Sequence, residues 1–121
     1  MSKTILIVED HEDFRQILSG ILAEFGYRVR EATNGHEALR SVQQSVPDMV
    51  LMDLSMPKMD GVTAARRIRN LPETQAMPLI CMTTYGEPFR QAALEAGFNE
   101  LLPKPFDIDL LIKIINRFIN G

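Results

Sequence analysis

Four short apolar runs and one weakly alternating run along the chain predict five β-strands. They span residues 4–8, 27–32, 49–52, 79–82 and 101–102. The first and third runs are rich in branched apolar residues without polar alternation, which is typical of strands buried on both faces of a sheet. The second run alternates weakly and predicts a shorter, more exposed strand. The apolar pattern therefore indicates a sheet with a buried centre.

The segments between these runs have the periodicity of amphipathic helices. The clearest one places apolar residues at i, i+3, i+4 and i+7, and its predicted buried stripe is Phe14, Ile17, Leu18, Ile21, Leu22 and Phe25. Gly26 is expected to end this helix, and Asn34 and Asp107 are expected to cap the second and the last helix. Strands and helices thus alternate five times, which predicts one domain over residues 1–121 with a mostly parallel sheet covered on both faces.

The last helix carries more apolar residues than one stripe needs. Its predicted core stripe is Ile108, Leu111, Ile112, Ile115, Phe118 and Ile119. Leu110 and Ile114 lie about a third of a turn beyond this stripe. They belong either to a wide buried face or to an exposed patch for a partner or for self-association.

Polar residues follow four of the predicted strands. Glu9 and Asp10 follow the first, Asp53 the third, Thr83 the fourth and Lys104 the fifth. Ligand sites of open parallel sheets form beyond the carboxyl ends of the strands, so these side chains are expected to converge. Two unit charges about 4 Å apart repel by about 4 kcal/mol at an effective dielectric constant of 20, so three carboxylates favour a divalent cation. Oxygen ligands with retained waters suit Mg²⁺. The alternative is a solvated acidic loop.

Asp53 is the candidate nucleophile of this site. A carboxylate can attack phosphorus and form an aspartyl-phosphate, and Lys104 would neutralise charge on the phosphoryl oxygens while the Thr83 hydroxyl donates to them. The plainer alternatives are a capping aspartate, a surface lysine and a hydroxyl bonded to the backbone.

The bulk composition narrows the function classes. The net charge of −3 argues against a nucleic-acid surface, and the single cysteine, Cys81, excludes an internal disulfide and suits a reducing cytosol. The first apolar run is too short to cross a membrane. A cytoplasmic protein without direct nucleic-acid or membrane contact is expected.

Four separated motifs resemble the receiver domain of two-component response regulators, over nearly the whole chain. They are Glu9-Asp10, Asp53 to Gly61, Met82-Thr83-Thr84 and Lys104-Pro105-Phe106. The resemblance implies a stand-alone receiver with a flavodoxin-like, doubly wound sheet of five parallel strands in the order 2-1-3-4-5 and five helices.

The resemblance also implies roles for particular residues. Asp53 would accept a phosphoryl group from a histidine kinase or a histidine phosphotransfer protein, with Thr83 and Lys104 as its partners. Asp10, Asp53 and the carbonyl of Ser55 would bind Mg²⁺, Glu9 would assist through water, and the Lys104–Pro105 bond would be cis. Leu101 stands where the family often has Tyr or Phe, so no ring rotation is predicted.

Such a protein is not an enzyme in the usual sense, because it would catalyse only its own phosphorylation and dephosphorylation. The last helix region would bind a downstream protein target, and phosphorylation would favour a homodimer. The rival interpretations are a receiver fragment of a larger regulator or hybrid kinase, a small phosphatase and a flavodoxin-like electron carrier. The acidic stretch of residues 9–13 argues against the last, because it would repel the flavin phosphate.

Overall fold

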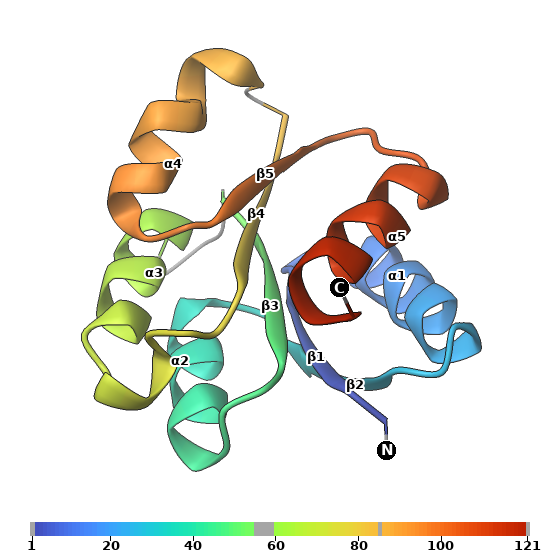
Figure 1. Ribbon diagram of the computed structural model, residues 1–121, viewed down its shortest axis with the longest axis horizontal. Helices are drawn as coiled ribbons and strands as arrows, with labels where there is room; N and C mark the ends of the chain where they lie inside the picture. Colours follow the sequence, from blue (N-terminus) through green and yellow to red (C-terminus); the bar gives the residue numbers. More distant parts are fainter. Residues whose placement is uncertain (1, 55–59, 85, 121) are drawn as a thin grey trace.

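The computed structural model describes residues 2–54, 60–84 and 86–120 (Figure 1). Five strands form one parallel sheet in the order β2-β1-β3-β4-β5. Their bounds are β1 Thr4–Val8, β2 Arg28–Ala32, β3 Met49–Asp53, β4 Leu79–Thr83 and β5 Glu100–Pro103. The predicted flavodoxin-like, doubly wound sheet is confirmed, including its strand order.

Five α-helices cover the two faces of the sheet. Their bounds are α1 Glu12–Glu24, α2 Gly35–Gln44, α3 Gly61–Arg69, α4 Arg90–Ala96 and α5 Ile108–Ile115. Helices α1 and α5 pack on one face, and α2, α3 and α4 pack on the other (Figure 1). Single 3₁₀ turns lie at Pro72–Thr74 and Glu87–Phe89, and a π-helical turn, Asn116–Asn120, follows α5.

The predicted helix ends are confirmed. The Asn34 side chain accepts from the backbone N–H of Glu37 at 2.9 Å, and the Asp107 side chain accepts from that of Leu110 at 2.7 Å. Each such cap satisfies an otherwise unpaired amide and stabilises the fold by about 1 kcal/mol. Gly26, after α1, adopts a φ of 92°, which glycine reaches without steric cost.

The core consists of two clusters, one on each face of the sheet. The cluster under α2, α3 and α4 contains Cys81, which is fully buried in β4, as predicted for a core residue. Burial, together with the negative charge of Asp53, raises the pKa of the Cys81 thiol to about 12, and the Lys104 charge only partly opposes this. The thiol therefore stays protonated at neutral pH and is a poor nucleophile.

Helix α1 buries a narrower face than the apolar stripe predicts. Ile17 and Phe25 are 63% and 52% exposed, so their predicted burial is wrong. The buried positions are Arg15, Leu18 and Leu22, which follow the i, i+3, i+7 spacing of a single face. A buried arginine thus occupies one turn of the face that packs on the sheet.

Helix α5 also differs from its predicted stripe. Ile114 is buried beside Leu111 and Ile115, which supports the wide buried face, but Leu110 is exposed. Ile108 is 46% exposed, so its predicted place in the core is wrong. Ile108 is the first residue of the helix, where the chain enters from the loop after β5.

An ion-pair network ties α4 and the C-terminal turn to β5. The Glu100 carboxylate contacts Arg90 of α4 through Oε1 and Arg117 Nη1 through Oε2, the latter at 3.1 Å, and it accepts from the Leu101 N–H at 2.9 Å. Burial alone would raise the pKa of Glu100, but the Leu101 hydrogen bond, the Arg90 hydrogen bond and the two arginine charges together lower it.

The lowered pKa makes this network sensitive to acid. Its stabilisation is fully present above the unfolded-state pKa of about 4.3 and is lost as the pH falls through the lower folded-state pKa. We expect Glu100→Gln to lower the free energy of unfolding at pH 7 by about 1 kcal/mol and to flatten its fall in acid. Urea unfolding across this pH range measures both effects. Glu73→Gln, at an exposed carboxylate, is the control, and an unchanged acid slope in Glu100→Gln would contradict the prediction.

Candidate functional site

The strand register brings the C-terminal ends of four strands, β1, β3, β4 and β5, to one edge of the sheet. Val8 pairs with Met52, Asp53 pairs with Met82, and Thr83 pairs with Pro103. The residues that follow these strands therefore lie at the same level. Backbone hydrogen bonds continue this strand alignment into the loops. For example, the Lys104 N–H donates to the Thr83 carbonyl at 2.7 Å.

Three carboxylates converge at this edge. Glu9, Asp10 and Asp53 each offer an oxygen atom, and these atoms lie within 4.8 Å of one another. Glu9 and Asp53 are buried, at 1% and 8% exposure, whereas Asp10 is exposed. Carboxylates that are buried and this close to one another need a cation to compensate their negative charge. Hard oxygen donors with one open side suit a divalent ion that keeps several waters, so the donor set fits Mg²⁺.

Lys104 supplies positive charge to the same cluster. Its Nζ lies 2.7 Å from Glu9 Oε1 and 3.5 Å from Asp53 Oδ1. The ammonium thus bridges two buried carboxylates but sits closer to Glu9 than to Asp53. The second oxygen of Glu9 accepts from the His11 N–H at 3.1 Å, so both oxygens of this carboxylate are engaged.

Arg15 holds the loop that carries Glu9 and Asp10 in place, a role that the sequence did not reveal. Its Nη1 donates to the Glu9 carbonyl at 3.0 Å, and its Nε donates to Glu31 Oε1 on β2 at 2.8 Å. The guanidinium therefore links helix α1, the Glu9 peptide and the neighbouring strand. The available signal was an arginine three residues before Leu18, on the buried side of the amphipathic pattern.

A phenylalanine ring lies beside the lysine and packs against a second one. The Phe14 ring centroid is 4.6 Å from Lys104 Nζ, within the range of a cation–π contact. The Phe106 ring meets the Phe14 ring edge to face, with centroids 5.8 Å apart and an interplanar angle of 81°. Phe14 thus contacts the site as well as the core, which its place in the apolar stripe did not reveal.

The remaining predicted residues are placed as follows. Thr83 is 2% exposed at the end of β4, and the Lys104–Pro105 bond is cis, as predicted. Leu101 is buried in the cluster under α4. Ser55, the predicted carbonyl ligand, lies outside the described residues. His11 is exposed and caps α1 through Nδ1, which accepts from the Phe14 N–H at 3.4 Å.

Gly61 holds the chain close to Asp53. A Cβ at this position would meet the Asp53 carbonyl oxygen at 2.7 Å and the Leu54 backbone at 2.8 Å. We expect Gly61→Ala to cost about 1–3 kcal/mol, because rigid backbone must move to admit the methyl group. Gly20→Ala is the control: its site in α1 is open, and alanine there should stabilise by about 0.5–1 kcal/mol. Thermal unfolding compares the two, and equal stability changes would contradict the close approach.

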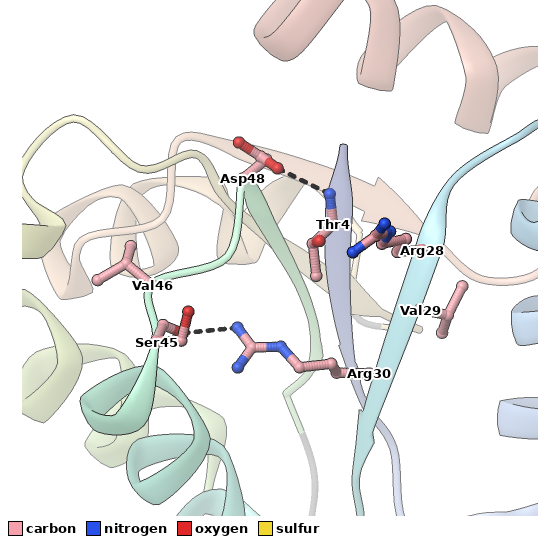
Figure 2. A pocket seen from close by; sticks show the side chains of 7 residues that line it. All are labelled: Thr4, Arg28, Val29, Arg30, Ser45, Val46 and Asp48. Atoms are coloured by element: carbon pink, nitrogen blue, oxygen red, sulfur yellow. Dashed lines mark hydrogen bonds between the residues drawn. The ribbon is translucent and has the colours of Figure 1, made fainter. Parts of the chain in front are cut away.

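A hollow lies at the opposite end of the sheet from the carboxylates. It has a volume of about 420 Å³ and lies beside the start of β2, lined by Thr4, Arg28, Val29, Arg30, Ser45, Val46 and Asp48 (Figure 2). The Arg30 guanidinium points toward the end of α2, where it donates to the carbonyls of Ser41 and Ser45. Asp48 accepts from the Thr4 N–H at 2.7 Å. These contacts join the α2–β3 loop to the sheet, far from the carboxylates.

The described residues include no helix with both the length and the apolar character needed to cross a bilayer.

Comparisons with known proteins agree with this geometry. Residues 5–116 match the model of the response regulator receiver domain. The chain is 35% identical to the chemotaxis protein CheY of Bacillus subtilis over 121 residues, covering 99% of this chain and 100% of CheY. It is 35% identical to sporulation initiation phosphotransferase F of the same organism, covering 98% and 95% of the two chains. The crystal structure of the receiver domain of a Pseudomonas aeruginosa sensor histidine kinase, with magnesium coordinated in its active site cleft, superposes with a TM-score of 0.92 at 34% identity over 100% of both chains.

Proposed function

Since this chain belongs to the family of response regulator receiver domains, we propose that it is a signalling switch in which Asp53 accepts a phosphoryl group in the presence of Mg²⁺. The observation that carries the proposal is the convergence of Glu9, Asp10 and Asp53 with the Lys104 ammonium at one sheet edge. A structural ion pair needs one carboxylate for one lysine. Here the lysine pairs with two carboxylates and a third lies beside them, which leaves negative charge for a metal ion to balance.

The Mg²⁺ site in this proposal consists of Asp10 and Asp53, with Glu9 close by and Ser55 as the further ligand implied by the family motif. The ion would supply charge neutralisation at the phosphoryl oxygens when bound. The magnesium in the Pseudomonas aeruginosa receiver structure, at 34% identity, supports this choice of metal.

The proposed transfer needs a nucleophile and groups that stabilise the negative charge of the phosphoryl oxygens. An Asp53 carboxylate oxygen forms a bond to phosphorus while the bond from phosphorus to the donor atom breaks, and the donor atom keeps the electron pair. Lys104 can reach the new phosphoryl oxygens because its Nζ already lies 3.5 Å from Asp53 Oδ1. The Thr83 hydroxyl, at the end of the adjacent strand, would donate to another of these oxygens. Attack by water on phosphorus would break the bond between phosphorus and the Asp53 oxygen, which regenerates the carboxylate and releases phosphate.

The switch in this proposal is the competition of two anions for Lys104. Phosphorylation adds close to two negative charges at Asp53, which would draw the ammonium away from Glu9 Oε1. Lys104 begins the connection from β5 to α5, and Ile108 at the start of that helix is exposed. Movement of Lys104 would therefore alter a surface that offers apolar contact area to a downstream protein.

The proposed phosphoryl donors are a histidine kinase or a histidine phosphotransfer protein, as expected for this family. In this proposal the donor approaches Asp53 from the side on which Asp10 is exposed. The chain would catalyse only its own phosphorylation and dephosphorylation, without turnover of a free substrate.

Acetyl phosphate tests this function without the natural donor. With Mg²⁺, the wild-type protein should gain one phosphoryl group, detected by intact mass, and removal of the metal with EDTA should prevent the gain. Asp53→Asn should remain unmodified, whereas the exposed control Asp13→Asn should be modified as the wild type is. Equal modification of Asp53→Asn and the wild type would refute the proposal.

A further inference from the structure

We infer that Phe14 is a positioning residue, whose ring holds the Lys104 ammonium in place for the phosphoryl transfer. The inference rests on the proposed function but concerns a side chain on a different element, helix α1. The geometry that carries it is the 4.6 Å separation between Lys104 Nζ and the centroid of the Phe14 ring. At this distance the negative face of the ring attracts the cation.

The ring adds a third contact to the ammonium, beside those of the two carboxylates. Glu9 Oε1 and Asp53 Oδ1 contact Nζ at 2.7 and 3.5 Å, and the backbone of Lys104 is bonded to the Thr83 carbonyl. Lysine has a four-carbon side chain with many rotamers, so contacts at its tip decide where the charge lies. Phe14 adds a contact that carries no charge and cannot compete with the carboxylates for a metal ion.

The Phe14 ring is itself held. Phe106, two residues after Lys104, meets it edge to face at 5.8 Å and 81°, a preferred geometry for aromatic pairs. Phe14 lies in the first turn of α1, and its N–H donates to His11 Nδ1 at 3.4 Å. Helix α1 and the β5–α5 connection are thereby joined through the contact between the two rings.

Loss of the ring should leave Lys104 less well ordered. The ammonium would retain its shorter contact with Glu9 and would sample the position beside Asp53 less often. We expect Phe14→Leu to lower the phosphorylation rate at saturating acetyl phosphate about threefold to tenfold, as for loss of a partly exposed cation–π contact. Affinity for Mg²⁺ should change less than about twofold, because a phenyl ring offers no oxygen ligand to the ion.

Phe14→Leu and Phe14→Tyr form the matched pair for the test. Leucine keeps an apolar side chain and removes the ring face, whereas tyrosine retains the face and should restore the wild-type rate. Because tyrosine also preserves the packing of the ring, the ring-current shift of the Lys104 protons distinguishes contact with the ammonium from packing alone. Equal rates in the leucine variant and the wild type would overturn the inference while leaving the proposed function standing. Absence of phosphorylation in the wild type as well would overturn both.

NMR of the wild-type protein tests the geometry without a variant at Phe14. The Lys104 Hε protons, assigned by their loss in Lys104→Arg, should be shifted upfield by the ring current of Phe14. Methylene protons of Lys113, exposed on α5, provide the unshifted reference. Lys104 resonances at the reference position would overturn the inference, whatever the stability of the leucine variant.

Discussion

Millimolar Mg²⁺ is expected to raise the melting temperature of the wild-type protein, and Asp10→Asn and Asp53→Asn are expected to remove most of that rise. Three carboxylate oxygens within 4.8 Å create a local negative charge that the cation relieves. At ten times its dissociation constant, a ligand that binds only the folded state adds about 1.4 kcal/mol, which is roughly 5 °C for a domain of this size. A thermal shift titration with MgCl₂ measures the effect.

The same variants should differ from the wild type in the opposite sense when no metal is added. Each removes one of three mutually repelling charges, so apo Asp10→Asn should be at least as stable as the apo wild type. Asp13→Asn, on the exposed side of α1, should respond to Mg²⁺ as the wild type does. Equal stabilisation of all four proteins by Mg²⁺ would mean that the ion does not bind at this cluster.

Lys104→Met should produce the second large effect, with a size that depends on the metal. In the absence of Mg²⁺ this substitution leaves the buried Glu9 carboxylate and Asp53 without the ammonium that now lies 2.7 and 3.5 Å away. Loss of one partner of a largely buried pair costs about 1–3 kcal/mol here, since Lys104 keeps 19% of its side-chain surface exposed. Urea unfolding should detect this loss.

Mg²⁺ should restore the stability of Lys104→Met and should bind it more tightly than it binds the wild type. The ion would take over charge compensation that the lysine supplies in its absence. The phosphorylated variant should also fail to change its affinity for a downstream partner. Lys113→Met, which removes an exposed lysine from α5, is the control. A Lys104→Met protein with wild-type stability and wild-type metal affinity would contradict this view of the ion pair.

The convergence of the site was predictable because it depends on topology alone. Once strands and helices alternate, parallel strands must place Glu9, Asp53 and Lys104 at one edge, and no side-chain detail is needed. Helix caps such as Asn34 and Asp107 were predictable for a similar reason, since their hydrogen bonds are local in sequence.

Contacts between distant side chains were not predictable in this way. The preference of Lys104 for Glu9 over Asp53 depends on the reach of two flexible side chains that are 95 positions apart. The burial of Arg15 depends on its pairing with Glu31 on a neighbouring strand, whereas Ile17 remains exposed although it fits the apolar stripe. Hydrophobic periodicity measures the average face of a helix, but it does not show which residues the neighbouring elements will cover.

Reduction of the phosphorylated protein with borohydride, followed by peptide mass spectrometry, tests the central claim most directly. Borohydride converts an aspartyl-phosphate to homoserine and so marks the residue that carried the phosphoryl group. After incubation with a phosphodonor and Mg²⁺, homoserine should occur at position 53 and at no other aspartate. Homoserine at Asp10, or an acid-labile phosphoryl group at His11 with position 53 unchanged, would contradict the assignment of Asp53 as the acceptor.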